Sequence, residues 1–130
     1  MVVDTSAVVT ILLNEPGSGQ FVRALDEALS LKMSAASVLE VAIVVESRFS
    51  NGARKQLDAW LQDTSIEVVP LTRRHVEAAR DGFRRFGKGR HPAALNFGDC
   101  FSYGLAKALG EPLLFRGNDF SKTDLKSALP

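Results

Sequence analysis

The chain has 130 residues, of which 45% are hydrophobic and 24% charged, and its formal net charge is +1. This length predicts one domain over residues 1–130, large enough to remove roughly two-thirds of its unfolded surface from water. No apolar run approaches the ~20 residues of a bilayer span and no secretory leader pattern is present, so we expect a cytoplasmic protein with no membrane partner. The single cysteine, Cys100, excludes an intrachain disulfide and fits a reducing compartment.

The charges are distributed unevenly along the chain. Residues 73–91 carry seven basic side chains against two acidic ones, a local balance of +5 that leaves −4 for the remainder. Such a division suits a protein that holds cations at one place and meets a polyanion at another. The alternative is an arginine-rich helix face that is merely solvated.

Apolar periodicity predicts strands and helices in alternation. In chain order we expect a strand before Asp4, helices at 7–13 and 19–29, a strand at 31–34, helices at 37–49 and 53–62, a strand at 66–70, a helix capped by Thr72, a loop at 87–94, a helix from Asn96 to 109 ended by Gly110, and a strand at 112–115. Alternation of this kind predicts an α/β fold of three layers, with a mainly parallel central sheet flanked by helices.

Two of these helices rest on specific patterns. Ser37 to Glu40 matches a capping box, so we expect a helix from Ser37 even though residues 41–45 are rich in β-branched side chains. For the helix after Thr72, the spacing predicts that one apolar stripe faces the core, and this stripe contains Val76, Ala79, Phe83 and Phe86.

Four acids occupy positions related by the predicted sheet. Asp4 follows the first strand and Asp119 the last, while Glu40 and Asp99 are expected in the first turns of helices among apolar neighbours. Each alone could simply cap a helix. Ligands of parallel sheets bind beyond the carboxyl ends of the strands, where all four acids would meet. Buried carboxylates need a compensating charge, and all-oxygen ligands favour Mg²⁺ or Mn²⁺, so the pattern predicts a site for such an ion.

Four motifs in order closely resemble the PIN-domain ribonucleases, and among them the VapC toxins of bacterial toxin–antitoxin pairs. They are MVVDTSA at 1–7, SVLE at 37–40, LNFGDC at 95–100 and LLFRGNDF at 113–120. The resemblance implies a PIN-like fold and a Mg²⁺-dependent endoribonuclease, with Mn²⁺ as a substitute. It also implies catalytic roles for Asp4, Glu40, Asp99, Asp119 and, as the hydroxyl near the first acid, Ser6. Many family members carry an acid where this chain has Gly117, so the fourth acid falls to Asp119. The implied partners are an RNA substrate, a VapB-type antitoxin and a second copy of the chain.

The basic residues then have a role in holding the RNA backbone. We expect these contacts from Arg84, Arg85, Lys88, Arg90 and Arg116. The alternative from another class is a non-catalytic signalling or interaction module of receiver type, which also places an aspartate after a strand. Such a module needs further acids at the first strand and a lysine after a later one, where this chain has Arg116.

Overall fold

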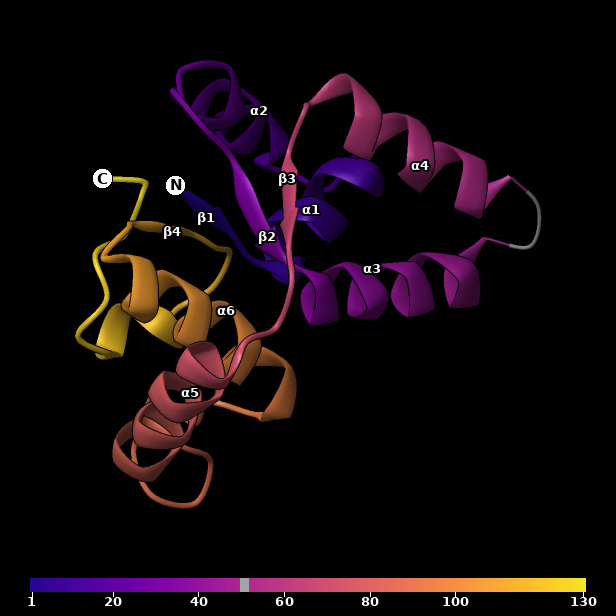
Figure 1. Cartoon of the computed structure of the whole chain (residues 1–130). Helices are drawn as coiled ribbons and strands as arrows, with labels where there is room; N and C mark the ends of the chain where they lie inside the picture. The colour runs from indigo at the N-terminus through magenta and orange to yellow at the C-terminus, as the bar shows by residue number, and fades with distance from the viewer. Residues whose placement is uncertain (50–51) are drawn as a thin grey trace.

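The computed structural model describes residues 1–49 and 52–130, and at its centre lies a parallel sheet (Figure 1). Its strands are β1 (Val2–Val3), β2 (Lys32–Ser34), β3 (Glu67–Val69) and β4 (Leu113–Leu114), in the order β3-β2-β1-β4. Val2 pairs with Lys32 on one side and with Leu113 on the other, and every pairing is parallel. The carboxyl ends of the strands therefore share one edge, as the sequence predicted.

Helices cover both faces of this sheet. They are α1 (Thr5–Leu12), α2 (Ser18–Asp26), α3 (Ala35–Arg48), α4 (Ala53–Asp63), α5 (Arg73–Phe86) and α6 (Phe97–Leu109), followed by the short 3₁₀ helix η1 (Phe120–Lys122). Figure 1 shows α5 and α6 together on one side of the molecule, with α3 and α4 extending on the other. Among the described residues, no helix combines the length and the apolar character needed to cross a membrane.

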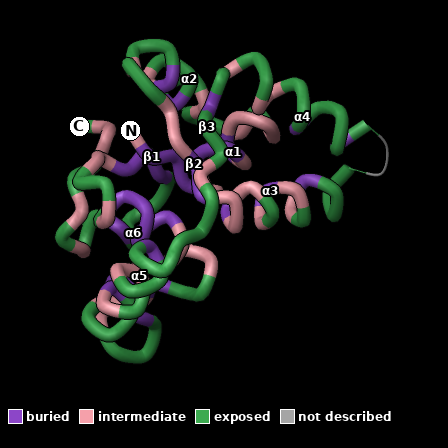
Figure 2. The backbone as a smooth tube through the Cα atoms, viewed as in Figure 1, coloured by how far each residue is buried: buried purple, intermediate pink, exposed green. Residues whose placement is uncertain are grey.

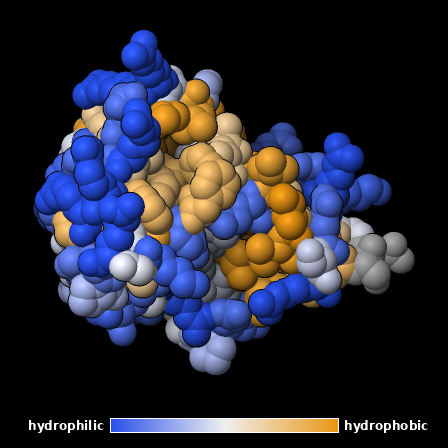
Figure 3. Space-filling model, turned by 90° about the horizontal axis from the view of Figure 1, so that it is seen from below, coloured by the Kyte–Doolittle hydropathy of each residue, from blue (hydrophilic) through white to orange (hydrophobic). Residues whose placement is uncertain are grey.

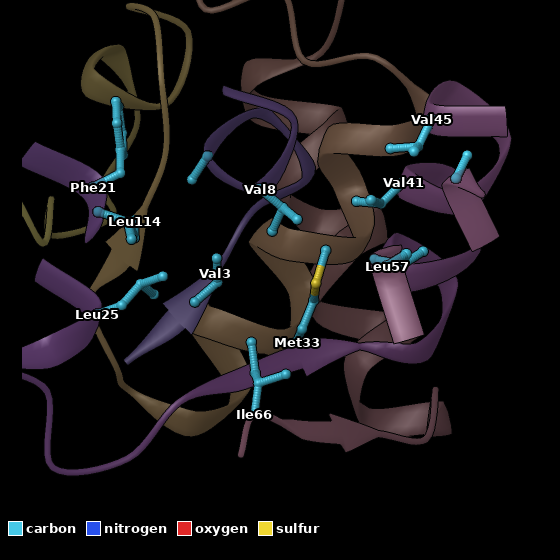
Figure 4. Packing of buried hydrophobic residues seen from close by; sticks show 12 residues of the cluster. Val3, Val8, Phe21, Leu25, Met33, Val41, Val45, Leu57, Ile66 and Leu114 are labelled. Carbon is cyan, nitrogen blue, oxygen red and sulfur yellow. The ribbon is translucent and has the colours of Figure 1, made fainter. Parts of the chain in front are cut away.

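Two hydrophobic clusters separate the three layers. Val3, Met33 and Leu114 contribute to the cluster formed with α1 to α4 (Figure 4), whereas Val2 and Leu113 pack in the cluster that contains residues of α6. Adjacent strand residues point to opposite faces, so both faces need apolar side chains. Figure 2 shows buried residues around β1 and along α6, whereas β3 at the edge of the sheet is mainly exposed. The predicted three-layer α/β fold is confirmed.

Several helices begin where a side chain satisfies the first free backbone N–H groups. Asp4 caps α1 through the N–H of Ser6, Thr72 caps α5 through the N–H of His75, and Asn96 caps α6. Gly110 ends α6 in the left-handed conformation that favours glycine, with φ of 66°. These boundaries agree with the sequence patterns because capping depends only on neighbouring residues.

The predicted start of α3 is wrong. The helix begins at Ala35 with Ser34 as its N-cap, and Ser34 makes no side-chain capping bond. Ser37 is instead buried inside the helix, with its Oγ 3.3 Å from Oγ of Ser102 in α6. Glu40 consequently lies in the second turn of α3 rather than the first. The helical assignment of residues 41–45 is confirmed.

The predicted buried face of α5 is also wrong in part. Val76 and Phe83 are 38% and 37% exposed, while His75 and Gly82 are buried. A side chain at position 82 would lie 2.9 Å from Cζ of Tyr103, so the absence of one allows α5 to approach α6 closely. This contact rotates the helix away from its most apolar stripe and leaves Val76 and Phe83 at the surface.

Candidate active site

Asp4 lies at the carboxyl end of β1, where it is only 3% exposed. Its Oδ2 accepts hydrogen bonds from the N–H of Ser6 at 2.9 Å and from the hydroxyl of Ser6 at 2.6 Å. The same hydroxyl accepts a bond from the backbone N–H of Arg116 at 3.0 Å, just after β4. Ser6 thus orients the carboxylate of Asp4 and ties it to the neighbouring strand end.

Asp99 is the third residue of α6 and forms a reciprocal cap with Asn96. The N–H of Asn96 donates to Oδ2 of Asp99 at 2.9 Å, and the N–H of Asp99 donates to Oδ1 of Asn96 at 2.9 Å. The pKa of Asp99 is raised to about 6. Burial is the largest cause, the bond from Asn96 opposes it, and the charges of Asp4, Asp119 and Glu40 add to the rise. Besides capping the helix, Asp99 therefore shares one region with the other three acids.

Glu40 reaches this region from α3, across the first turn of α6. A Cβ at Gly98 would lie 2.9 Å from Cδ of Glu40, so the carboxylate rests against the backbone next to Asp99. Sequence reasoning missed this role of Gly98, although a glycine inside a predicted helix is a signal of close approach.

Asp119 is the most exposed of the four acids. It immediately precedes η1 in the segment after β4 and makes no side-chain capping bond. Gly117, two residues earlier, has φ of 97°, a conformation in which an acidic side chain would be strained. The backbone at position 117 therefore favours glycine.

The four acids suit a hard divalent cation by their chemistry, since every donor is a carboxylate oxygen. None of the ion pairs of the described residues involves them, so no protein cation compensates their charge. Hydrogen bonds engage Oδ2 of Asp4 and of Asp99, which leaves Oδ1 of each for a ligand. Within residues 1–49 and 52–130, however, no three His, Cys, Asp or Glu side chains lie close enough to hold an ion as they stand. The acids would have to draw closer together around it.

The exposed side chain of Arg116 turns back towards α1. Its Nη1 forms an ion pair with Glu15 and lies 3.3 Å from Oγ1 of the buried Thr10. With its backbone bond to Ser6, this contact fastens the segment after β4 to both ends of α1. No local pattern could have revealed a pairing between residues so far apart in the chain.

The other predicted RNA contacts are all exposed, but two of them are in ion pairs. Arg84 pairs with Asp81 at 3.1 Å and Arg85 with Asp124 at 3.1 Å. Lys88 is exposed, and the guanidinium of Arg90 lies 5.6 Å from the ring centre of Phe83. Tyr103 and Lys107 also donate to Asp124 and, despite the opposing effect of burial, help to hold its pKa at about 2. The RNA-binding roles stay predictions.

The fold agrees with comparisons to known proteins. The family model of the PIN domain matches residues 1–126, so the chain belongs to the PIN-domain family. Two full-length relatives then narrow the class. The chain is 48% identical over 131 residues to ribonuclease VapC30 of Mycobacterium tuberculosis, and the match covers 100% of each protein. It is 50% identical over 125 residues to ribonuclease VapC of Mycolicibacterium smegmatis, and this match covers 96% of the chain and 97% of the relative. Within its family, the chain is of the VapC type.

A solved structure supports the same architecture. The crystal structure of Mycobacterium tuberculosis VapC20, described as a Sarcin-Ricin loop cleaving toxin, superposes with a TM-score of 0.79. The match covers 99% of this chain and 98% of the other at 19% sequence identity. At that identity the likeness concerns the fold alone.

Proposed function

We infer that the chain is an endoribonuclease that hydrolyses RNA phosphodiester bonds as the toxin of a toxin–antitoxin pair. The chain matches VapC relatives that are named as ribonucleases, and each match spans essentially the full length of both proteins. The observation that carries the proposal in this chain is the placement of acids at one edge of the sheet. Asp4 is buried at the end of β1, and the carboxylate of Glu40 rests against Gly98, next to Asp99. Acids that share one region at the carboxyl edge of a parallel sheet form a site for a cation and the anionic substrate that it binds.

We propose that Asp4, Glu40, Asp99 and Asp119 hold Mg²⁺, with Mn²⁺ as a substitute. When bound, such an ion supplies a Lewis acid that polarises a phosphate oxygen and lowers the pKa of a coordinated water. Ser6 orients Asp4 and the backbone of Asn96 orients Asp99, so two of the four donors are preorganised. Glu40 and Asp119 have more freedom to adjust.

The RNA backbone would be held by the exposed basic residues Arg84, Lys88 and Arg90. Each phosphate that they neutralise releases counterions, so the affinity for RNA should fall as the salt concentration rises. Arg84, Arg85 and Arg116 would have to give up ion pairs with acidic side chains, and we expect smaller contributions from these three than from Lys88 and Arg90.

The proposed partners are a VapB-type antitoxin and a second copy of the chain, in the cytoplasm. An antitoxin could block the site by placing a basic side chain among the four acids, a charge-assisted contact that replaces the cation. The test is co-expression with the product of the adjoining upstream reading frame. Co-purification with loss of cleavage supports the proposal, and sedimentation of the toxin alone measures whether it dimerises.

The test of the enzyme is cleavage of structured RNA in Mg²⁺, in Mn²⁺ and in EDTA. Asp4→Asn and Asp99→Asn should each lower the rate by roughly a hundredfold or more, because a cation ligand is lost. Asp26→Asn, an exposed acid at the end of α2, is the matched control and should cleave at the wild-type rate. Cleavage that persists in EDTA and in both site variants would refute the assignment. Mapping RNA 5′ ends after expression in cells would identify the substrate.

A further inference from the structure

Ser34, at the end of β2, is a buried serine whose hydroxyl makes no hydrogen bond. Only 2% of the residue is exposed, and its Oγ has no hydrogen-bond partner among residues 1–49 and 52–130. A buried hydroxyl without a partner destabilises a protein, and few such groups occur in folded structures. Ser34 is also the N-cap residue of α3, yet its side chain makes no capping bond. The usual role of a serine at the start of a helix therefore does not explain it.

The register of the sheet places Ser34 beside Asp4. Val2 of β1 pairs with Lys32 of β2, and the two strands are parallel. Two residues further along each strand, Asp4 therefore lies opposite Ser34, and the backbone of Asp4 is still extended. Neighbouring strands are about 4.8 Å apart. A serine hydroxyl and a carboxylate at adjacent positions of this kind can meet through small rotations of their side chains.

The side chains of Ser34 and Asp4 point to the same face of the sheet. Met33 and Val3, the residues before them, both pack in the cluster formed with α1 to α4. Successive side chains of a strand alternate between the two faces, so the next residue of each strand points to the face that α6 covers. Val69, the partner of Ser34 in β3, packs against the cluster on that face. The pairing with β3 thus gives the same orientation for Ser34.

Asp4 has one oxygen that can accept a further hydrogen bond. Both bonds from Ser6 go to Oδ2, and within the described residues Oδ1 accepts none. Because no three acids in this part of the chain lie close enough to hold an ion, Asp4 must shift or turn when a cation binds. A carboxylate that binds a cation is usually held by hydrogen bonds from neighbouring groups. Ser34 is a neighbouring donor that can supply one.

Ser34 lies beneath the surface that a substrate would meet. Figure 3 views the molecule from below, the side on which the strands end, and shows a more polar strip between two hydrophobic areas. Since only 2% of Ser34 is exposed, its hydroxyl cannot contact RNA directly. An effect of Ser34 on cleavage must therefore pass through a neighbouring side chain.

We propose that Ser34 is a positioning residue of the cation site, whose hydroxyl donates a hydrogen bond to Oδ1 of Asp4 when the acids close around a divalent cation. The inference rests on the proposed ribonuclease function and adds a residue that does not itself bind the ion. Ser6 and Ser34 then hold the two oxygens of one carboxylate, from α1 and from β2. The hydroxyl gains its partner only when the acids close, which strengthens the binding of the cation.

The test compares stability with cation affinity in Ser34→Ala. In EDTA, this substitution should raise Tm by roughly 3–8 °C, because it removes a buried hydroxyl that has no partner. The affinity for Mn²⁺, measured from the electron paramagnetic resonance signal of the free ion, should fall roughly tenfold to a hundredfold, because a residue that supports a ligand is lost. A substitution that merely damaged the fold would lower both quantities.

Ser37→Ala is the matched control. Ser37 is as buried as Ser34, but its Oγ has a partner, Oγ of Ser102 at 3.3 Å. Removing it leaves the hydroxyl of Ser102 unpaired, so Tm should fall by a few degrees while the affinity for Mn²⁺ stays at the wild-type value. Ser34→Thr keeps the hydroxyl on a residue that suits a strand, and it should bind Mn²⁺ as tightly as the wild type does.

Three results would overturn the positioning role. They are a lower Tm of Ser34→Ala in EDTA, a wild-type affinity for Mn²⁺ in that variant, and a loss of affinity in Ser34→Thr as large as in Ser34→Ala. A wild-type protein that neither binds Mn²⁺ nor cleaves RNA overturns the proposed function as well. A wild-type protein that does both, together with unchanged affinity in Ser34→Ala, overturns this inference alone.

Discussion

Substitution of Gly98 by alanine should separate activity from stability. The added Cβ would lie 2.9 Å from Cδ and 3.0 Å from Oε1 of Glu40, well inside ordinary van der Waals contact. Because the carboxylate is the free end of a flexible side chain, it can swing away without moving the backbone. A displacement of about 1 Å at a reacting centre can lower a rate by roughly a hundredfold, which is the loss that we expect.

The fold should gain from the same change. Alanine in place of a helical glycine stabilises by about 0.5–1 kcal/mol, or roughly 2–4 °C in Tm for a chain of this size. The assay compares thermal melting with the initial rate of RNA cleavage over a range of Mg²⁺ concentrations. Gly19→Ala in α2, where the nearest atom to the new Cβ is 3.7 Å away, is the control and should keep full activity. A wild-type rate in Gly98→Ala, or a parallel loss of rate and Tm, would refute the reasoning.

Three further changes test the surroundings of the site. Without a divalent ion, the pKa of Asp99 is about 6 in the folded protein, against an ordinary value of 3.8. The folded protein therefore binds this proton more tightly than the unfolded chain does, and its stability should fall as pH rises from about 4 through 6. In melts recorded in EDTA, Asp99→Asn should remove this pH dependence. It should also raise the free energy of unfolding by about 1 kcal/mol at pH 7.5, a figure reduced for the solvent screening of a partly exposed group. A wild-type stability that rises with pH over this range would contradict the argument. Gly82→Ala should cost about 1–3 kcal/mol in urea unfolding, since the ring of Tyr103 is fully buried and cannot yield easily, whereas an unchanged midpoint would show that the helices separate freely. Glu15→Gln should release Arg116 and slow cleavage a few-fold with the fold retained, and the exchanged pair Glu15→Arg with Arg116→Glu should recover part of the rate; full activity in Glu15→Gln would show that the tie is dispensable.

Much of the fold follows from patterns confined to a few neighbouring residues. Thr72 and Asn96 begin α5 and α6 as predicted, and Gly110 ends α6, because each bonds to or bends the adjacent backbone. The strand positions were also predictable, since short apolar runs between helices have few alternatives in an α/β chain. The rule that parallel strands share a carboxyl edge then sufficed to place Asp4 and Asp99 in one region.

The errors and omissions all involve contacts between distant parts of the chain. Ser37 resembles a cap, but its partner is Ser102, which is 65 residues away and converts it into a buried position. Arg116 looked free for RNA until its contact with Thr10, 106 residues earlier, was seen. Neither the capping pattern nor the local charge carries information on such partners. Likewise, the spacing of apolar residues in α5 could not show that Gly82 would form its contact face.

The close packing of α5 on α6 has a consequence for how substrates are cut. Without a side chain at position 82, α5 lies against Tyr103, so the helix that bears the arginines cannot shift relative to the helix that bears Asp99. The two helices should then move as one unit, so a substitution that displaces α5 should also displace Asp99 and lower the rate of cleavage.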